Sequence, residues 1–128
     1  MPTESDIKKA VADYLQYKEN QGKLWYARLN AGDFIETRGN TRRRIKGVGK
    51  GTADLIVIQS TNVQTQYKGQ AKGSPYPIAR VTFVECKSSK GKPSKEQLEF
   101  AERVMGLNCR YFVVRSVEEV QNILGDKG

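Results

Sequence analysis

The chain has 128 residues, of which 38% are hydrophobic and 28% are charged, a composition typical of a folded domain with its own hydrophobic core. Its 22 Lys and Arg residues outnumber the 14 Asp and Glu residues and give a formal net charge of +8, so we expect a polyanionic partner, nucleic acid before an anionic membrane. The sequence contains no histidine, which excludes His-dependent triads and His–metal sites, and it has no apolar run long enough to span a membrane.

The first predicted element is a helix over residues 3–19. Thr3 is a suitable N-cap, and apolar side chains recur at helical spacing along one stripe, at Ile7, Val11, Tyr14 and Leu15. Glu4 lies in the first turn on the same side as this stripe. It either turns inward toward other functional groups or only complements the helix dipole, and the sequence leaves both interpretations open.

Two short strands and a basic segment follow this helix. Residues 24–29 favour a strand, and residues 34–36 favour a second strand that pairs back against it. Residues 38–51 are rich in glycine and lack acidic residues, and their basic side chains are Arg38, Arg42, Arg43, Arg44, Lys46 and Lys50. Because glycine lets backbone amides approach a ligand closely, we interpret this segment as a phosphate-contacting hairpin or loop, with a merely solvated charge run as the alternative.

Two strands in the middle of the chain carry the candidate chemistry. Residues 55–58 form an uninterrupted apolar run, typical of a strand buried on both faces, and Asp54 stands at its start. Residues 81–87 predict a second strand, in which Glu85 and Lys87 share one face and end its apolar stripe. Taken alone, this pair is better explained as a weak surface ion pair.

The polar segment at about 59–79 separates these strands, and we expect it to form a surface hairpin or loop insert within a single domain of residues 1–128. The second strand is followed by a basic loop that contains Ser88, Lys90 and Lys92. Ser94 and Gln97 form a capping-box pattern at the start of a helix, whose predicted apolar stripe is Leu98, Ala101, Val104 and Met105. A strand at 109–114 and a helix capped by Ser116 complete the chain.

The order of these elements predicts a mixed sheet flanked by helices. If the two middle strands are neighbours, Asp54 and Glu85 meet at one edge of the sheet, with Lys87 one pleat beyond them. Two carboxylates are suitable ligands for a hard divalent cation. In a chain without histidine, metal-assisted hydrolysis is the mechanism that these residues supply best.

These segments also resemble a known family. Gly51-Thr-Ala-Asp54-Leu-Ile-Val and Phe83-Val-Glu85-Cys-Lys87, with the downstream Ser94 and Gln97, are similar to the VRR-NUC branch of the PD-(D/E)XK nuclease superfamily. Glu4-Ser-Asp-Ile resembles the N-terminal helix motif of that family, and Arg28-Leu-Asn30-Ala-Gly32 resembles its Arg-Asn-x-Gly segment. Ala53 departs from the family pattern, which usually has proline before the aspartate.

The resemblance implies an α/β fold with a restriction-endonuclease-like PD-(D/E)XK core, a mixed central β-sheet flanked by α-helices. It implies a metal-dependent endonuclease in which Asp54, Glu85 and the backbone carbonyl of Cys86 hold Mg²⁺ or Mn²⁺. Lys87 would orient the attacking water or stabilise negative charge, with Glu4 and Gln97 as auxiliary catalytic groups.

The substrate that the resemblance implies is branched DNA such as a Holliday junction. The stand-alone, phage-type relatives act as homodimers, so the resemblance also implies a homodimer. The expected DNA contacts are Arg28 and Asn30, the six basic residues between Arg38 and Lys50, and Ser88, Lys90 and Lys92. The expected location is the cytoplasm, that of a host cell if a phage encodes the protein. Two alternatives stay open, a restriction-like endonuclease with a fixed sequence and a basic nucleic-acid-binding module without catalysis.

Overall fold

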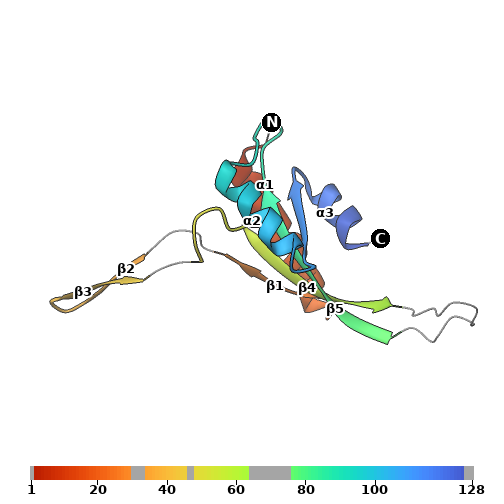
Figure 1. Cartoon of the computed structure of the whole chain (residues 1–128), viewed down its shortest axis with the longest axis horizontal. Coiled ribbons are helices and arrows are strands. Elements are labelled where there is room, and N and C mark those ends of the chain that lie inside the picture. Colours follow the sequence, from red (N-terminus) through yellow and green to blue (C-terminus); the bar gives the residue numbers. More distant parts are fainter. Residues whose placement is uncertain (1, 30–33, 46–47, 64–75, 126–128) are drawn as a thin grey trace, which may run out of the picture.

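The computed structural model describes residues 2–29, 34–45, 48–63 and 76–125, and Figure 1 shows their arrangement. The elements follow in the order α1 (Glu4–Asn20), β1 (Trp25–Arg28), β2 (Phe34–Arg38), β3 (Thr41–Ile45), β4 (Leu55–Val63), β5 (Tyr76–Cys86), α2 (Lys95–Met105), β6 (Arg110–Val114) and α3 (Val117–Leu124). In the described part of the chain, no helix combines the length and the apolar character that crossing a membrane requires.

The body of the molecule is a four-stranded sheet in the order β1-β4-β5-β6. The pairs β1–β4 and β4–β5 are antiparallel and the pair β5–β6 is parallel, so the sheet is mixed. Helices lie against both of its faces, α1 and α3 on one and α2 on the other. The predicted α/β architecture of a mixed central sheet flanked by helices is therefore confirmed.

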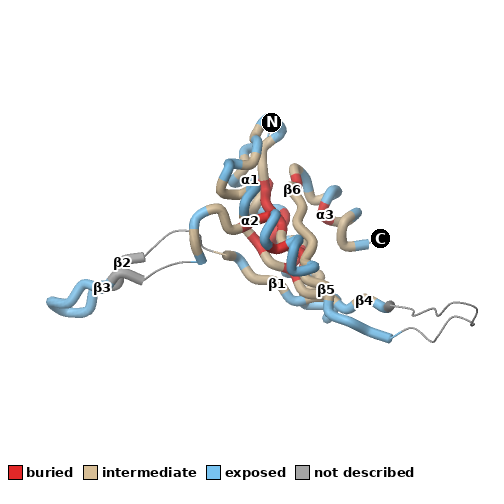
Figure 2. The backbone as a smooth tube through the Cα atoms, viewed as in Figure 1, coloured by how far each residue is buried: buried red, intermediate tan, exposed pale blue. Residues whose placement is uncertain are grey.

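The main core lies between the sheet and the helices α1 and α3, where the buried residues concentrate (Figure 2). Its fully or almost fully buried members are Ile7, Val11, Leu15, Leu55, Val57, Val84, Cys86, Val114 and Val120. In β4, Leu55 and Val57 are buried but Ile56 and Ile58 are only half-buried. The prediction that this strand is buried on both faces is therefore only partly correct. The face that carries Ile56 and Ile58 is incompletely covered, because α2 leaves part of it open.

The second face of the sheet packs on α2 through aromatic rings. Phe83 and Phe100 meet edge to face with their ring centroids 5.1 Å apart, and Tyr111 follows at 6.2 Å from Phe100. The predicted apolar stripe of α2 is half wrong, since Leu98 and Met105 are 56% and 52% exposed. The helix instead presents Phe100, Ala101 and Val104 to the sheet, together with Gln97 one turn earlier.

The predicted partner of the strand at 34–36 is also wrong. β1 pairs with β4, whereas β2 pairs with β3 in a separate two-stranded hairpin with the register Arg38↔Thr41. Among the described elements, β2 and β3 contact only each other, and Figure 1 shows the hairpin standing away from the body. The basic segment therefore extends from the molecule as a ribbon, and does not fold back on β1.

The predicted insert at about 59–79 begins and ends as paired strand. Residues 59–63 continue β4, residues 76–79 continue β5, and the pairing extends from Gln59↔Arg80 to Val63↔Tyr76. Residues 64–75 lie outside the described part of the chain. The long β4–β5 pair keeps its register over nine residue pairs, and that register fixes which side chains meet at its other end.

Candidate active site

The register of β4 and β5 brings Asp54 and Glu85 to the same end of the sheet. The last pair of this ladder is Leu55↔Val84. Asp54 comes one residue before Leu55 and Glu85 one residue after Val84, so in this antiparallel pair both lie just beyond the last pair. One oxygen of Asp54, Oδ2, accepts a hydrogen bond of 2.8 Å from the backbone N–H of Cys86. The carboxylate of one strand is thus fixed to the backbone of the other, next to Glu85.

Glu85 is a buried carboxylate, only 2% exposed. Its Oε2 accepts a hydrogen bond of 3.0 Å from Gln97 and faces the ammonium group of Lys87 at 3.5 Å, whereas its Oε1 has no hydrogen-bond partner. Burial, and then the negative charge of Asp54, raise the pKa of Glu85 to about 7, against the opposing effect of Lys87. An uncompensated buried oxygen of this kind is a position where a cation would bind favourably.

The capping box of α2 places the amide that holds Glu85. Ser94 Oγ accepts from the backbone N–H of Gln97 at 3.2 Å, and Gln97 Oε1 accepts from the backbone N–H of Ser94 at 2.8 Å, as the sequence predicts. The side-chain oxygen of Gln97 is therefore occupied by the cap, and its NH₂ group is directed toward Glu85. One residue caps the helix and fixes the carboxylate.

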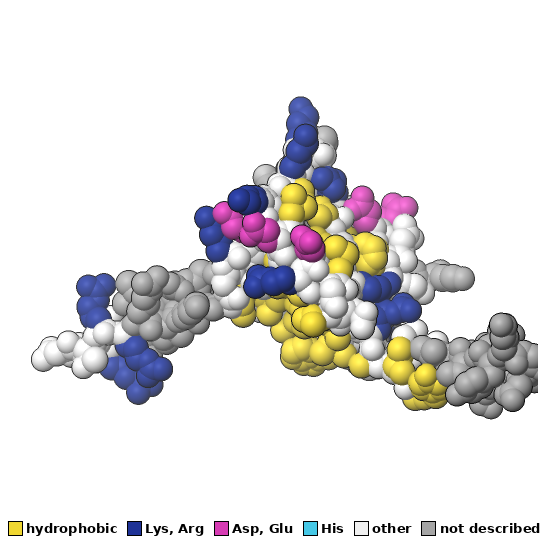
Figure 3. Space-filling view, viewed as in Figure 1, with side chains coloured by type: hydrophobic (Ala, Val, Ile, Leu, Met, Phe, Trp, Pro, Cys, Tyr) yellow, Lys and Arg dark blue, Asp and Glu magenta, His cyan; other side chains and the backbone are white. Residues whose placement is uncertain are grey.

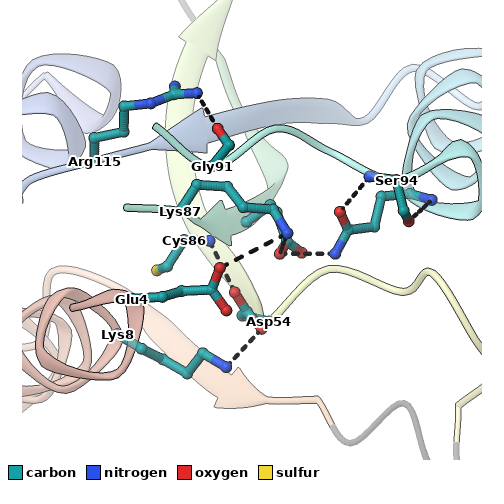
Figure 4. A network of polar contacts seen from close by, with 10 residues as sticks. Glu4, Lys8, Asp54, Cys86, Lys87, Gly91, Ser94 and Arg115 are labelled. Carbon is teal, nitrogen blue, oxygen red and sulfur yellow. Dashed lines mark hydrogen bonds and ion pairs between the residues drawn. The ribbon is translucent and has the colours of Figure 1, made fainter. Parts of the chain in front are cut away.

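Lys87 and Glu4 complete this side of the site, as Figure 4 shows. The side chain of Lys87 is 13% exposed, and its ammonium group lies between Glu85 and Oε1 of Glu4, which is 3.8 Å away. Glu4 therefore turns inward from the first turn of α1 and contacts the site through Lys87.

Lys8 also belongs to the site, although the sequence reasoning missed it. Its ammonium group lies 3.1 Å from Oδ1 of Asp54. Burial alone would lower the pKa of Lys8, but its hydrogen bond to Asp54 and the charge of that carboxylate raise it above the ordinary value. The available signal was its position one helical turn after Glu4, on the same side of α1.

The donors present fit a hard divalent cation held by few protein ligands. Among the described residues, no group of three or more Asp, Glu or Cys side chains could hold a metal ion. The side-chain donor candidates are therefore the two carboxylates, Asp54 and Oε1 of Glu85, and the backbone carbonyl of Cys86 is the further donor that the family resemblance implies. Mg²⁺ is commonly bound by one or two carboxylates, with water and substrate phosphate completing the shell. The Cys86 thiol is not among these donors, because burial raises its pKa to about 12.

The predicted DNA-contacting residues fall in three places. Arg28 is exposed at the end of β1, where the next backbone N–H, that of Leu29, donates to the carbonyl of Asp54 at 2.8 Å. Lys90 and Lys92 are exposed and Ser88 is half-buried in the loop after β5, which Arg115 fastens through the carbonyl of Gly91 at 2.8 Å. These two groups border the carboxylates.

The remaining basic residues lie on the hairpin and after it. Arg38, Arg42 and Arg43 are exposed, and Figure 3 shows basic side chains gathered at the outer end of the hairpin. Lys50 lies closer to the body, 3.5 Å from Glu96 of α2. Asn30 and Lys46 lie outside the described residues, as does the side chain of Arg44. The structure thus does not bring the hairpin side chains to the carboxylates.

The VRR-NUC domain family matches residues 3–118, which include Glu4, Asp54, Glu85, Lys87 and Gln97. The chain belongs to the VRR-NUC domain family. This family is part of the PD-(D/E)XK superfamily, so the chain carries a nuclease domain, for which DNA is the implied substrate and a divalent metal the general requirement. No curated protein and no solved structure gives a match to this VRR-NUC chain.

Proposed function

We propose that this VRR-NUC protein is a Mg²⁺- or Mn²⁺-dependent, structure-specific endodeoxyribonuclease that hydrolyses phosphodiester bonds in branched DNA such as Holliday junctions. The observation that carries the proposal is the convergence of Asp54 and Glu85, with Oε1 of Glu85 buried and without a partner. Burying a carboxylate oxygen without a partner costs free energy of folding. A divalent cation bound to that oxygen would offset this cost.

In this proposal each residue near the carboxylates has a separate task. Asp54, Glu85 and the Cys86 carbonyl hold the ion, which when bound polarises the phosphate and lowers the pKa of a water molecule. Gln97 fixes Oε2 of Glu85, so that Oε1 is the oxygen left for the ion. Lys87 stabilises negative charge on the phosphate or orients the attacking water, and Glu4 holds the Lys87 ammonium group in place.

Recognition of DNA shape is supported by where the basic residues lie. The proposed contacts are Arg28, Ser88, Lys90 and Lys92 on the body, Arg38, Arg42, Arg43 and Arg44 on the hairpin, and Lys50 after it. Asn30 and Lys46, which lie outside the described residues, are also proposed contacts. Lysine and arginine side chains of this kind contact phosphates, which position DNA without reading its sequence. One set of these residues lies on the body and the other on the hairpin that stands away from it (Figure 1). Two separated DNA-contacting surfaces suit a substrate with more than one duplex arm.

We also propose a homodimer, because a two-fold enzyme can cut two symmetric strands. Three large apolar side chains on α2 and just after it, Leu98, Met105 and Leu107, are more than half exposed, and apolar surface of this kind suits a protein contact. Light scattering measures the mass directly, and a value near that of a single 14.4 kDa chain at all concentrations would contradict the dimer.

A cleavage panel tests the activity. Four-way junctions, flaps and linear duplex are incubated with the protein in Mg²⁺, Mn²⁺ or EDTA. We expect Asp54→Asn and Glu85→Gln to reduce cutting by at least about a hundredfold, because each removes a charged ligand that stabilises the transition state. Glu102→Gln and Glu118→Gln, which change exposed acids elsewhere on the surface, are matched controls and should cut normally.

The panel also separates the alternatives. Undiminished cutting by Asp54→Asn or Glu85→Gln would refute the assignment of the site. Cutting of plain duplex at one sequence would favour a restriction-like enzyme. Tight binding without cutting in either metal, unchanged by Glu85→Gln, would favour a module that only binds nucleic acid.

A further inference from the structure

The two oxygens of Asp54 have different surroundings. Oδ2 accepts the backbone N–H of Cys86 at 2.8 Å, within the β4–β5 edge, and Oδ1 faces the ammonium group of Lys8 at 3.1 Å. The backbone bond is part of the folded strand edge, whereas Lys8 has a long side chain that is 38% exposed. Oδ1 is therefore the oxygen of Asp54 that a divalent cation can take, and Lys8 occupies it.

Lys8 also lines a groove that leads away from the carboxylates. This open groove of about 680 Å³ lies between α1 and β1, and Lys9, Gln16, Tyr26 and Arg28 are among its other lining residues. Its positive groups are Lys8, Lys9 and Arg28, and its negative groups are Asp13 and Asp6, of which Asp6 is held in the capping box of α1 by the backbone N–H of Thr3. The groove is connected to Asp54 through Lys8, which lines the groove and contacts the carboxylate.

We propose that Lys8 holds the place of the divalent cation at Asp54 in the metal-free protein, and that cation binding transfers its ammonium group to the backbone of the DNA strand in the α1–β1 groove. The inference rests on the proposed nuclease function. A cation at Oδ1 and an ammonium group at the same oxygen repel each other, so one displaces the other. Figure 4 shows that Lys8 reaches Asp54 from α1, so rotation of its side chain leads into the groove that it lines.

This exchange couples the two ligands. Without a cation, Lys8 neutralises Asp54 and is held away from DNA. With a cation bound, the positive charge of Lys8 is available to a phosphate, so each ligand strengthens binding of the other. Lys87 has no such role, because its ammonium group is held between Glu85 and Glu4.

The first experiment measures cation affinity without DNA. Isothermal titration calorimetry measures the Mn²⁺ affinity of the wild type, Lys8→Met and Lys9→Met. The Lys9 variant is the control, because it removes the same charge from the next, exposed position of α1. Lys8→Met should bind Mn²⁺ roughly fivefold or more tightly, because a direct competitor has been removed. Lys9→Met should change the affinity by less than about twofold, because it acts only through a screened charge at longer range.

Lys8→Gln is a second variant, for use if Lys8→Met folds poorly. It keeps a hydrogen-bond donor for Asp54 without the charge, and it should also bind Mn²⁺ more tightly than the wild type. Equal affinities of the Lys8 and Lys9 variants, or weaker binding by both Lys8 variants, would overturn the inference. If the wild type binds Mn²⁺ and cuts DNA while the variants behave alike, the inference alone fails. If the wild type binds no divalent cation, the proposed function fails with it.

The second experiment measures affinity for a four-way junction by fluorescence anisotropy, in EDTA and in Ca²⁺, a divalent cation that also prefers oxygen ligands. Ca²⁺ should strengthen DNA binding by the wild type and by Lys9→Met several-fold. The gain should be lost in Lys8→Met, because no ammonium group is released. A gain in Lys8→Met as large as in the wild type would show that Lys8 does not pass to DNA.

Discussion

At the scale of the single residue, Glu85 decides between two interpretations of its strand. Alternation places Glu85 and Lys87 together, and the sequence alone allows a weak surface pair. The structure buries Glu85 and leaves Lys87 only 13% exposed, so the pair is not a surface pair. The sequence alone could not reveal this burial, because it depends on how α2 and α1 pack around the end of β5, where Gln97 binds Glu85 and Glu4 faces Lys87.

The raised pKa of Glu85 gives a prediction for the metal-free protein. The group has an ordinary pKa of 4.5 and a folded-state pKa of about 7, so between these values the folded protein holds a proton that the unfolded chain releases. Stability from this group is therefore fully present below about pH 4.5 and is lost as the pH rises through 7. Thermal unfolding in EDTA should show a higher midpoint at pH 5.5 than at pH 8.

Glu85→Gln should remove most of this pH dependence, because the amide does not titrate, and it should raise the midpoint at pH 8. Glu102→Gln, at an exposed position of α2, is the control and should keep the wild-type slope. If Glu85→Gln unfolds with an unchanged slope between pH 5.5 and 8, another group carries the effect.

At the scale of the element, the capping residues of the helices were predicted correctly, but the partner of one strand and the inward face of one helix were not. Thr3, Ser94 and Ser116 cap α1, α2 and α3 as predicted, because a cap depends on a few neighbouring residues. The partner of β2 was mispredicted although β3 follows it directly, because the run of arginines in β3 lacks the apolar alternation that predicts a strand. The inward face of α2 was misjudged because counting apolar residues favours Leu98, whereas the helix presents Phe100 to the sheet and Gln97 to Glu85.

The loop before Asp54 depends on one glycine. Gly51 has φ +88°, and a Cβ atom built there would lie 2.5 Å from the carbonyl oxygen of Glu96 in the first turn of α2. The backbone of the loop that leads to Asp54 therefore passes close to the first turn of the helix that carries Gln97. Gly51→Ala should destabilise the protein by more than the roughly 1–2 kcal/mol that a left-handed conformation costs alone, because backbone must also move.

Gly49→Ala is the matched control, since Gly49 also has positive φ, +105°, but its nearest neighbour would be 4.0 Å from the new Cβ. Urea unfolding should show a clearly larger loss for Gly51→Ala than for Gly49→Ala, and cutting should fall further as well. Equal losses would mean that only the backbone conformation matters, and that the loop does not depend on its contact with α2.

At the scale of the whole molecule, one group of arginines lies away from the core. The body contains the core and the carboxylates, whereas exposed arginines gather on a hairpin that contacts no other described element (Figure 3). An isolated two-stranded hairpin is marginally stable in water, so this one contributes little to the fold. A two-stranded ribbon does, however, have the width that the major groove of DNA admits. The hairpin is therefore suited to holding a duplex arm away from the site of cutting.

Removing charge from the hairpin should therefore affect DNA binding alone. In the double variant Arg42→Ala and Arg43→Ala, affinity for a four-way junction should fall, and the salt dependence of binding should lose about one unit of slope for each phosphate contact removed. The urea midpoint and the Mn²⁺ affinity should not change, because the arginines lie outside the core and away from the carboxylates. Anisotropy titrations at several salt concentrations measure the slope.

The control for this variant removes the same charge from the body, by Lys95→Ala and Arg103→Ala on α2, both exposed. If net charge alone attracted DNA, both double variants would lower the affinity and the slope alike. A larger effect of the hairpin pair would locate the contact on the ribbon. A loss of stability in the hairpin variant would instead mean that the ribbon packs on protein, and a second copy of the chain would then be its partner.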